Sequence, residues 1–217
     1  MRLWKSHRPS ARCGLSMVEA VLAIALLVLL LSSAILAASG GYGAFRKMQD
    51  ATDTEARIRR ALDRVASELL SVGTEELLPD PTGQFGTSTL LFRKAVGLNG
   101  LQVVWGDQNR IAFEYEPEET NDGTDEDGDG LIDEGRVVLV HDVGGNERQA
   151  VLCNGVAELL EGEGANGADD NGNGVIDEAG FNIHRVGDVL FLRLSLLETA
   201  DTGNIVRTLE TSVRVRN

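Results

Sequence analysis

Two short acidic segments place oxygen-bearing side chains at alternate positions, an arrangement with which proteins surround a hard divalent cation. The first reads DEDGDGLIDE over 125–134, and the second reads DDNGNGVIDE over 169–178. Alternate residues of a tight turn direct their oxygens to one centre, and the glycines permit the sharp bend. We therefore expect a calcium ion in each of two loops, over 121–135 and 165–179. The candidate ligands are Asp125, Asp127, Asp129, Asp133, Glu134 and the main-chain carbonyl of Leu131 in the first loop, and Asp169, Asn171, Asn173, Asp177, Glu178 and the carbonyl of Val175 in the second.

Both segments match the front of an EF-hand calcium loop, but neither has the glutamate of its twelfth position, where Arg136 and Gly180 stand. They resemble more closely the shortened extracellular pattern DxDxDGxxCE, with Asp133 and Asp177 in place of its cysteine. The expectation is a weakly bound structural calcium ion, with a dissociation constant of about 10⁻⁴–10⁻³ M. A solvated turn without metal is the alternative, because aspartate, asparagine and glycine favour turns by themselves.

Residues capable of other chemistry are sparse. His7, His141 and His184 have no serine or cysteine motif beside them, and the glycines form no phosphate-binding GxxxxGK[ST] pattern. Cys153 is expected to be a small buried residue. The formal net charge of −14, with no basic stripe after the first twelve residues, argues against contact with nucleic acid. We expect a non-enzymatic protein whose favoured ligands are divalent cations.

The elements that must carry the loops begin with a membrane-type segment. Basic residues crowd the N-terminus at Arg2, Lys5, Arg8 and Arg12, and no charged side chain occurs over 20–38. As a helix rising about 1.5 Å per residue, this run would extend for about 28 Å and cross the hydrocarbon layer of a bilayer. Acid-rich sequence follows, so the positive-inside rule predicts a cytoplasmic N-terminus and an exported remainder.

Glu19 stands at the edge of the apolar run, where a lone carboxylate is costly and usually has a partner. The stretch GLSMVE over 14–19, between a basic leader and a long apolar helix, resembles the processing signal of type IV prepilins and type II secretion pseudopilins. The resemblance implies that a prepilin peptidase cleaves between Gly14 and Leu15, which replaces the usual phenylalanine, and methylates the new N-terminus. Glu19 would then pair with the α-amine of Leu15 in a neighbouring subunit. A simple signal anchor and a cleaved signal peptide remain as alternatives.

The remaining chain is expected to form an α+β structure. Ile58, Leu62, Val65 and Leu69 recur at helical spacing, which predicts an amphipathic stem helix within 40–72 that packs on a sheet. Glycines at 40, 41 and 43 predict a break between this stem and a transmembrane helix over 15–39. A β-rich head is expected over 73–217, where the period changes to two. Strands are predicted over 89–93, 101–105, 110–115, 137–141, 149–153, 188–196 and 205–215, with a hairpin turn at 201–204.

Three further stretches carry a looser resemblance: NRIAFEYEPE over 109–118, RQAVLCNGVAELL over 148–160 and the ending TLETSVRVRN. They resemble the PilW and J-type branch of minor pilins and pseudopilins. The resemblance implies a type IV pilin fold with a leader over 1–14, and a structural subunit of a type IV pilus or a type II secretion filament.

The partners implied by this resemblance are other pilin or pseudopilin subunits, the prepilin peptidase and the inner membrane. The chain would be a single-pass inner-membrane protein with a periplasmic head before assembly, and part of a periplasmic or cell-surface filament afterwards. The alternative is an exported, membrane-anchored calcium-binding protein that does not polymerise.

Overall fold

The computed structural model describes residues 16–199 and 205–215. The chain divides into two compact units, Met1–Asp50 and Ala51–Asn217. Helix α1 (Met17–Leu69) contributes its N-terminal part to the first unit and its C-terminal part to the second. The leader over 1–14, the expected cleavage site at Gly14 and Leu15, and the expected turn over 201–204 lie outside the described residues.

The first unit holds an apolar helical segment, Met17–Tyr42, that is long and hydrophobic enough to cross a membrane. Its most apolar window is 0% buried inside the protein, so these side chains need lipid or other helices around them. Such a segment can act as a membrane anchor or as a signal sequence.

The predicted glycine break does not occur in α1, which stays helical through residues 40–43. A glycine costs a helix only about 1 kcal/mol relative to alanine. A break would cost more, because each new helix end leaves four backbone groups without a partner in the helix.

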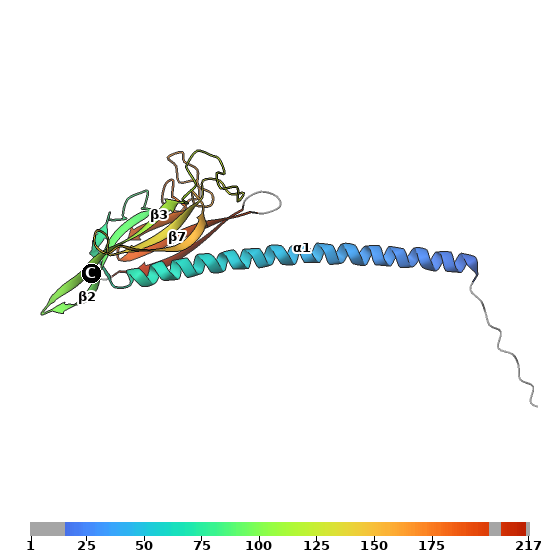
Figure 1. Cartoon of the computed structure of the whole chain (residues 1–217), viewed down its shortest axis with the longest axis horizontal. Helices are drawn as coiled ribbons and strands as arrows, with labels where there is room; N and C mark the ends of the chain where they lie inside the picture. Colours follow the sequence, from blue (N-terminus) through green and yellow to red (C-terminus); the bar gives the residue numbers. More distant parts are fainter. Residues whose placement is uncertain (1–15, 200–204, 216–217) are drawn as a thin grey trace, which may run out of the picture. The chain divides into compact units, whose positions relative to one another are not determined.

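The second unit is an antiparallel sheet with the C-terminal part of α1 packed on it (Figure 1). Its strands are β1 (Val72–Leu78), β2 (Thr89–Asn99), β3 (Gln102–Tyr115), β4 (Gly135–His141), β5 (Arg148–Val156), β6 (Phe181–Val186), β7 (Val189–Glu198) and β8 (Ile205–Arg214). They pair in the order β1-β2-β3-β4-β5-β7-β6, and β8 pairs with the other edge of β7. The α+β class predicted from the sequence agrees with this arrangement.

One hydrophobic core joins the helix to the sheet. The predicted stripe of α1 is buried, with Ile58, Leu62, Val65 and Leu69 each at most 2% exposed. The sheet contributes alternate residues, among them the four leucines of β7 at 190, 192, 194 and 196. Burying one such side chain contributes about 1.5–3 kcal/mol, so this stripe fixes the stem on the sheet.

Several boundaries differ from those predicted. Helix α1 ends at Leu69 because Val72 already begins β1, and the strands predicted over 101–105 and 110–115 are one strand, β3. Two strands were not predicted. β1 contains a register shift between Val72 and Leu77 that breaks its alternation, and β6 carries the buried polar Asn182.

Both acidic loops leave the same end of the sheet. Because β3, β4 and β5 are consecutive antiparallel neighbours, the carboxyl ends of β3 and β5 lie together. The first loop (residues 116–134) follows β3 and the second loop (residues 157–180) follows β5, and Figure 1 shows their coils beyond that end of the sheet. Asn121 Nδ2 of the first loop donates to Glu158 Oε1 of the second at 2.9 Å.

Candidate metal centre

The two loops follow the same backbone course. Left-handed residues recur at matching places, which are Gly123, Gly128, Gly130 and Asp133 in the first loop and Gly167, Gly172, Gly174 and Asp177 in the second. The φ angles of Asp133 and Asp177 are 52° and 47°, a region that few residues other than glycine adopt. The loops are therefore two copies of one structural unit.

Aspartate side chains fold the turn in each copy. Asp125 accepts hydrogen bonds from the N–H of Gly128 at 2.7 Å and of Gly130 at 3.0 Å. Asp169 holds the two corresponding glycine N–H groups of the second loop, at 2.7 and 2.8 Å. Asp127 likewise accepts the N–H of the residue two places on, at 2.9 Å. These bonds are of the kind that shape aspartate-rich turns, so the loop has a defined course without an ion.

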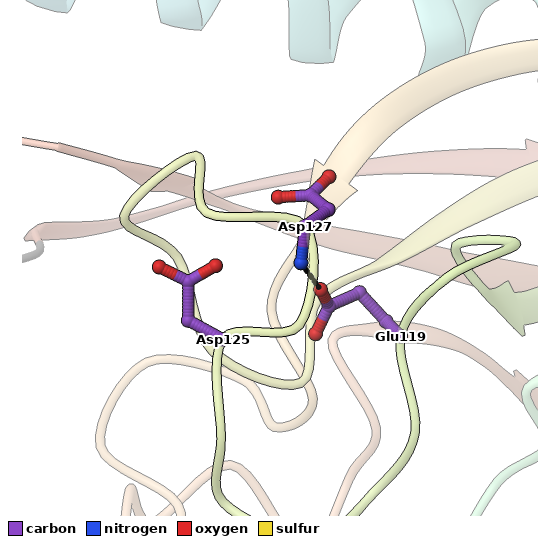
Figure 2. A group of neighbouring side chains, drawn as sticks. All are labelled: Glu119, Asp125 and Asp127. Atoms are coloured by element: carbon purple, nitrogen blue, oxygen red, sulfur yellow. Dashed lines mark hydrogen bonds between the residues drawn. The ribbon is translucent and has the colours of Figure 1, made fainter.

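The first loop gathers five carboxylates. Oxygens of Glu119, Asp125 and Asp127 lie within 4.8 Å of one another, as do oxygens of Asp127, Asp129 and Glu134. Figure 2 shows the first of these groups, in which the Asp127 N–H donates to Glu119 at 3.2 Å. Calcium bonds oxygen at about 2.3–2.6 Å. Two oxygens on opposite sides of one ion can therefore lie as far apart as the oxygens within each of these groups. The two groups share Asp127, and between them they contain four of the predicted ligands.

Glu134 is buried without a partner. Its side chain is 1% exposed, and neither of its oxygens has a hydrogen-bond partner in the described part of the chain. Burial is the main cause that raises the pKa of Glu134 to about 7; the residue's own backbone N–H lowers this pKa, and the negative charges of Glu119, Asp129 and Asp127 raise it. Burial also raises the pKa of Glu119, whose Oε2 is buried and unpaired. Buried carboxylates normally pair with a cation. Glu119 has two backbone N–H donors on Oε1, but in the described part of the chain neither it nor Glu134 has a positive partner.

Asp133 and Asp177 direct their carboxylates to the backbone at the start of their own loops. Asp133 accepts the N–H of Gly123 at 3.0 Å, and Asp177 accepts the N–H of Gly167 at 2.9 Å. These bonds close each loop on itself, and a role for either aspartate as a ligand stays a prediction. The carbonyl ligands also stay predictions, at the positions of Leu131 and Val175, whose side chains are buried.

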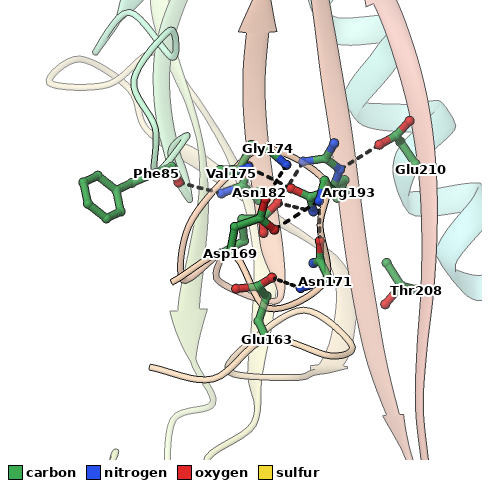
Figure 3. Close-up of polar contacts among 12 residues, drawn as sticks. Phe85, Glu163, Asp169, Asn171, Gly174, Val175, Asn182, Arg193, Thr208 and Glu210 are labelled. Carbon is green, nitrogen blue, oxygen red and sulfur yellow. Dashed lines mark hydrogen bonds and ion pairs between the residues drawn. The ribbon is translucent and has the colours of Figure 1, made fainter. Parts of the chain in front are cut away.

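The second loop differs in its charges. Asparagine replaces aspartate at Asn171 and Asn173, and Glu178 is 0% exposed. The Oε1 of Glu178 accepts hydrogen bonds from Asn173 Nδ2 and from Arg193 Nη1 of β7, each at 2.8 Å. Arg193 also bonds Glu210 of β8 at 2.7 Å, and Figure 3 shows its guanidinium between the loop and Glu210. Both three-carboxylate clusters within residues 16–199 and 205–215 lie in the first loop.

Sequence reasoning did not identify Glu119 and Glu163 as members of the site. In each loop this glutamate accepts a backbone N–H with Oε1 and buries an unpaired Oε2. The constant offset between the loops was the available signal, because it continues upstream of Asp125 and Asp169 to this pair of glutamates. Arg193 gave no such signal, since it reaches the site from a later strand.

Ser16 and Glu19 form a reciprocal cap at the start of α1. The Ser16 N–H donates to Glu19 Oε2 at 3.0 Å, and the Glu19 N–H donates to Ser16 Oγ at 3.2 Å. This is the capping box S-x-x-E, which satisfies two N–H groups at the helix start. Glu19 therefore has a partner in its own chain.

Cys153 and His141, which lie outside the loops, are held in place by the fold. Cys153 is buried, as predicted, and burial raises the pKa of its thiol to about 11, which disfavours the reactive thiolate. The His141 Nδ1 lies 2.8 Å from Asn109 Oδ1, so this ring is held by a neighbouring strand.

No protein-family model, curated protein or solved structure matches this chain.

Proposed function

We propose that the protein is a minor pilin or pseudopilin, a non-enzymatic subunit of a type IV pilus or type II secretion filament, with a structural calcium ion in its first loop. The observation that carries the proposal is the GLSMVE stretch over 14–19 at the head of an apolar helix. A basic leader, a cleavage glycine and a glutamate at the edge of the span occur together there. A simple signal anchor requires only the leader and the span.

Filament assembly gives the exposed helix a physical role. The side chains of Met17–Tyr42 are unburied within the chain, and helices of neighbouring subunits can cover them once the subunit leaves the bilayer. In such a bundle the Glu19 carboxylate would meet the α-amine of a neighbour's Leu15. Their attraction is stronger in a low-dielectric bundle than in water, and it compensates part of the cost of burying both charges.

The calcium ion is supported by the five carboxylates of the first loop and by the unpaired burial of Glu134. Calcium accepts six to eight oxygen ligands in flexible geometry, whereas magnesium requires a near-ideal octahedron and retains water. A loop that presents several carboxylates from one turn therefore suits calcium better. The ion would supply the positive charge that Glu134 and Glu119 lack.

The intact mass of the protein purified from membranes tests the proposed processing. We expect a chain that begins at Leu15 and carries one methyl group, and Gly14→Val should retain the leader. Ala11→Val, a leader substitution away from the cleavage site, is the matched control and should be processed normally. A Gly14→Val protein with the mature mass, or a wild-type protein that lacks the whole apolar segment, contradicts the proposal.

The second candidate is an anchored calcium-binding protein that does not polymerise, and the cap formed by Ser16 and Glu19 favours it. Glu19→Gln separates the two readings, because glutamine can still accept the Ser16 N–H but carries no charge. Glu19→Ala removes both the cap and the charge. If Glu19 pairs with an amine in a filament, both variants should remain in the membrane and be lost from sheared filaments. Normal incorporation of Glu19→Gln would refute charge pairing.

A further inference from the structure

The two loops differ in one respect that their shared backbone does not explain. Equivalent glutamates, Glu134 and Glu178, are 1% and 0% exposed. Neither oxygen of Glu134 has a partner among the described residues, whereas Oε1 of Glu178 accepts the guanidinium of Arg193 at 2.8 Å. The same position is therefore without a counter-charge in one loop and has one in the other.

Arg193 is fixed where it meets the second loop. Its side chain is 12% exposed, it comes from strand β7, and it bonds Glu178 of the loop. It also bonds Glu210 on the adjacent strand (Figure 3). The guanidinium is a rigid, planar group, so two carboxylates bonded to different nitrogens of it fix its orientation better than they would fix a lysine. The positive charge is therefore a fixed part of the sheet beneath the loop.

The second loop also carries fewer negatively charged candidate ligands than the first. The first loop presents carboxylates at Asp127 and Asp129, where the second presents the neutral amides of Asn171 and Asn173. Asn173 turns its Nδ2 toward Glu178 at 2.8 Å, so this side chain gives a donor to the glutamate. This contact would have to break before the Asn173 oxygen could turn to an ion at Glu178.

We propose that Arg193 is the built-in cation of the second loop: its guanidinium supplies the counter-charge that calcium supplies in the first loop, so each chain holds one ion. This inference rests on the calcium site proposed for the first loop. A divalent ion at the second loop would have to share the Glu178 carboxylate with the guanidinium of Arg193. Two positive charges bonded to one carboxylate repel strongly in a partly buried site. Arg193 is thus the residue that sets how many ions the protein binds.

Calcium stoichiometry of the full-length protein in detergent tests the inference. After removal of metal with EDTA and dialysis, equilibrium dialysis against calcium up to millimolar concentrations should give one ion per wild-type chain. Glu134→Gln should bind none, and Glu178→Gln should still bind one. Arg193→Met should bind two, while Arg193→Lys, which keeps the charge, should bind one.

The outcomes separate this inference from the proposal on which it depends. Two ions on the wild type, with one lost in Glu134→Gln and one lost in Glu178→Gln, would overturn the role of Arg193 and leave the first calcium site standing. No ion on the wild type would overturn the calcium site itself. A folded Arg193→Met protein that binds one ion would also refute the inference. If Arg193→Met does not fold, the counts on the wild type and the two glutamate variants decide.

Discussion

Replacing Glu134 with glutamine removes a buried negative charge and nearly preserves the shape of the side chain. The pKa of Glu134 is raised from an ordinary 4.5 to about 7, because the folded protein disfavours the ionised form. At about 1.36 kcal/mol per pKa unit, ionised Glu134 destabilises the metal-free fold by at most about 3 kcal/mol near pH 8. Without calcium, Glu134→Gln should therefore be more stable than the wild type.

Calcium should cancel most of the benefit of this substitution. At a calcium concentration about 100 times the dissociation constant, a bound ion stabilises the wild type by about 2.7 kcal/mol. The variant should lose most of this gain because it lacks a ligand. The melting temperature of Glu134→Gln should therefore lie above that of the wild type in EDTA, by at most about 12 °C at about 2–4 °C per kcal/mol. The two should converge as calcium is added.

Thermal unfolding of the full-length protein in detergent, followed by circular dichroism with EDTA and with about 10 mM calcium, measures both effects. Glu118→Gln is the matched control, since it makes the same chemical change at an exposed position of the same loop and should leave both melting temperatures unchanged. A Glu134→Gln protein that is less stable than the wild type in EDTA would refute the claim that this carboxylate lacks a partner. An equal calcium response in the two proteins would remove Glu134 from the site.

Two further outcomes follow from the same structure. The folded pKa of Glu134 lies above its unfolded value, so the metal-free folded protein binds one more proton than the unfolded chain between about pH 4.5 and 7. The melting temperature in EDTA should therefore fall as pH rises through this window. The fall should be smaller in Glu134→Gln. Leu62→Ala in the buried stripe of α1 should lower the free energy of unfolding of the full-length chain by about 2–5 kcal/mol, measured with denaturant. The control Asp63→Ala, on the exposed side, should change it by no more than about 0.5 kcal/mol. Equal effects would contradict the packing of this helix face on the sheet.

Elements whose pattern is local were predictable from the sequence. The stripe of Ile58, Leu62, Val65 and Leu69 and the alternating leucines of β7 are buried as expected, because burial on one face imposes a period that the sequence displays. The turns of the acidic loops were likewise visible, since aspartate and glycine bonds within a few residues shape them. Strand β1 was not, because the register shift between Val72 and Leu77 interrupts its period.

The electrostatics of the site were not visible in the sequence. The burial of Glu134 depends on how the first loop folds back against the end of the sheet, and no local pattern distinguishes Glu134 from Glu178. Arg193 lies on a later strand and meets the second loop only in the folded protein. Asp133 was assigned as a ligand from its place in the pattern; that role stays a prediction, and the sequence did not show that its carboxylate also accepts backbone N–H groups.

The missing counter-charge at Glu134 has a consequence for where the head becomes rigid. The calcium site proposed for the first loop, with an expected dissociation constant of about 10⁻⁴–10⁻³ M, would stay empty in a cytosol whose free calcium is kept at the far lower levels that intracellular sensors detect. If the head is exported as proposed, repulsion among these acids would lower the stability of this end of the newly made head while the chain is threaded through a translocation channel. Calcium outside the cytoplasm would remove that repulsion, so the head would reach its full stability only after export.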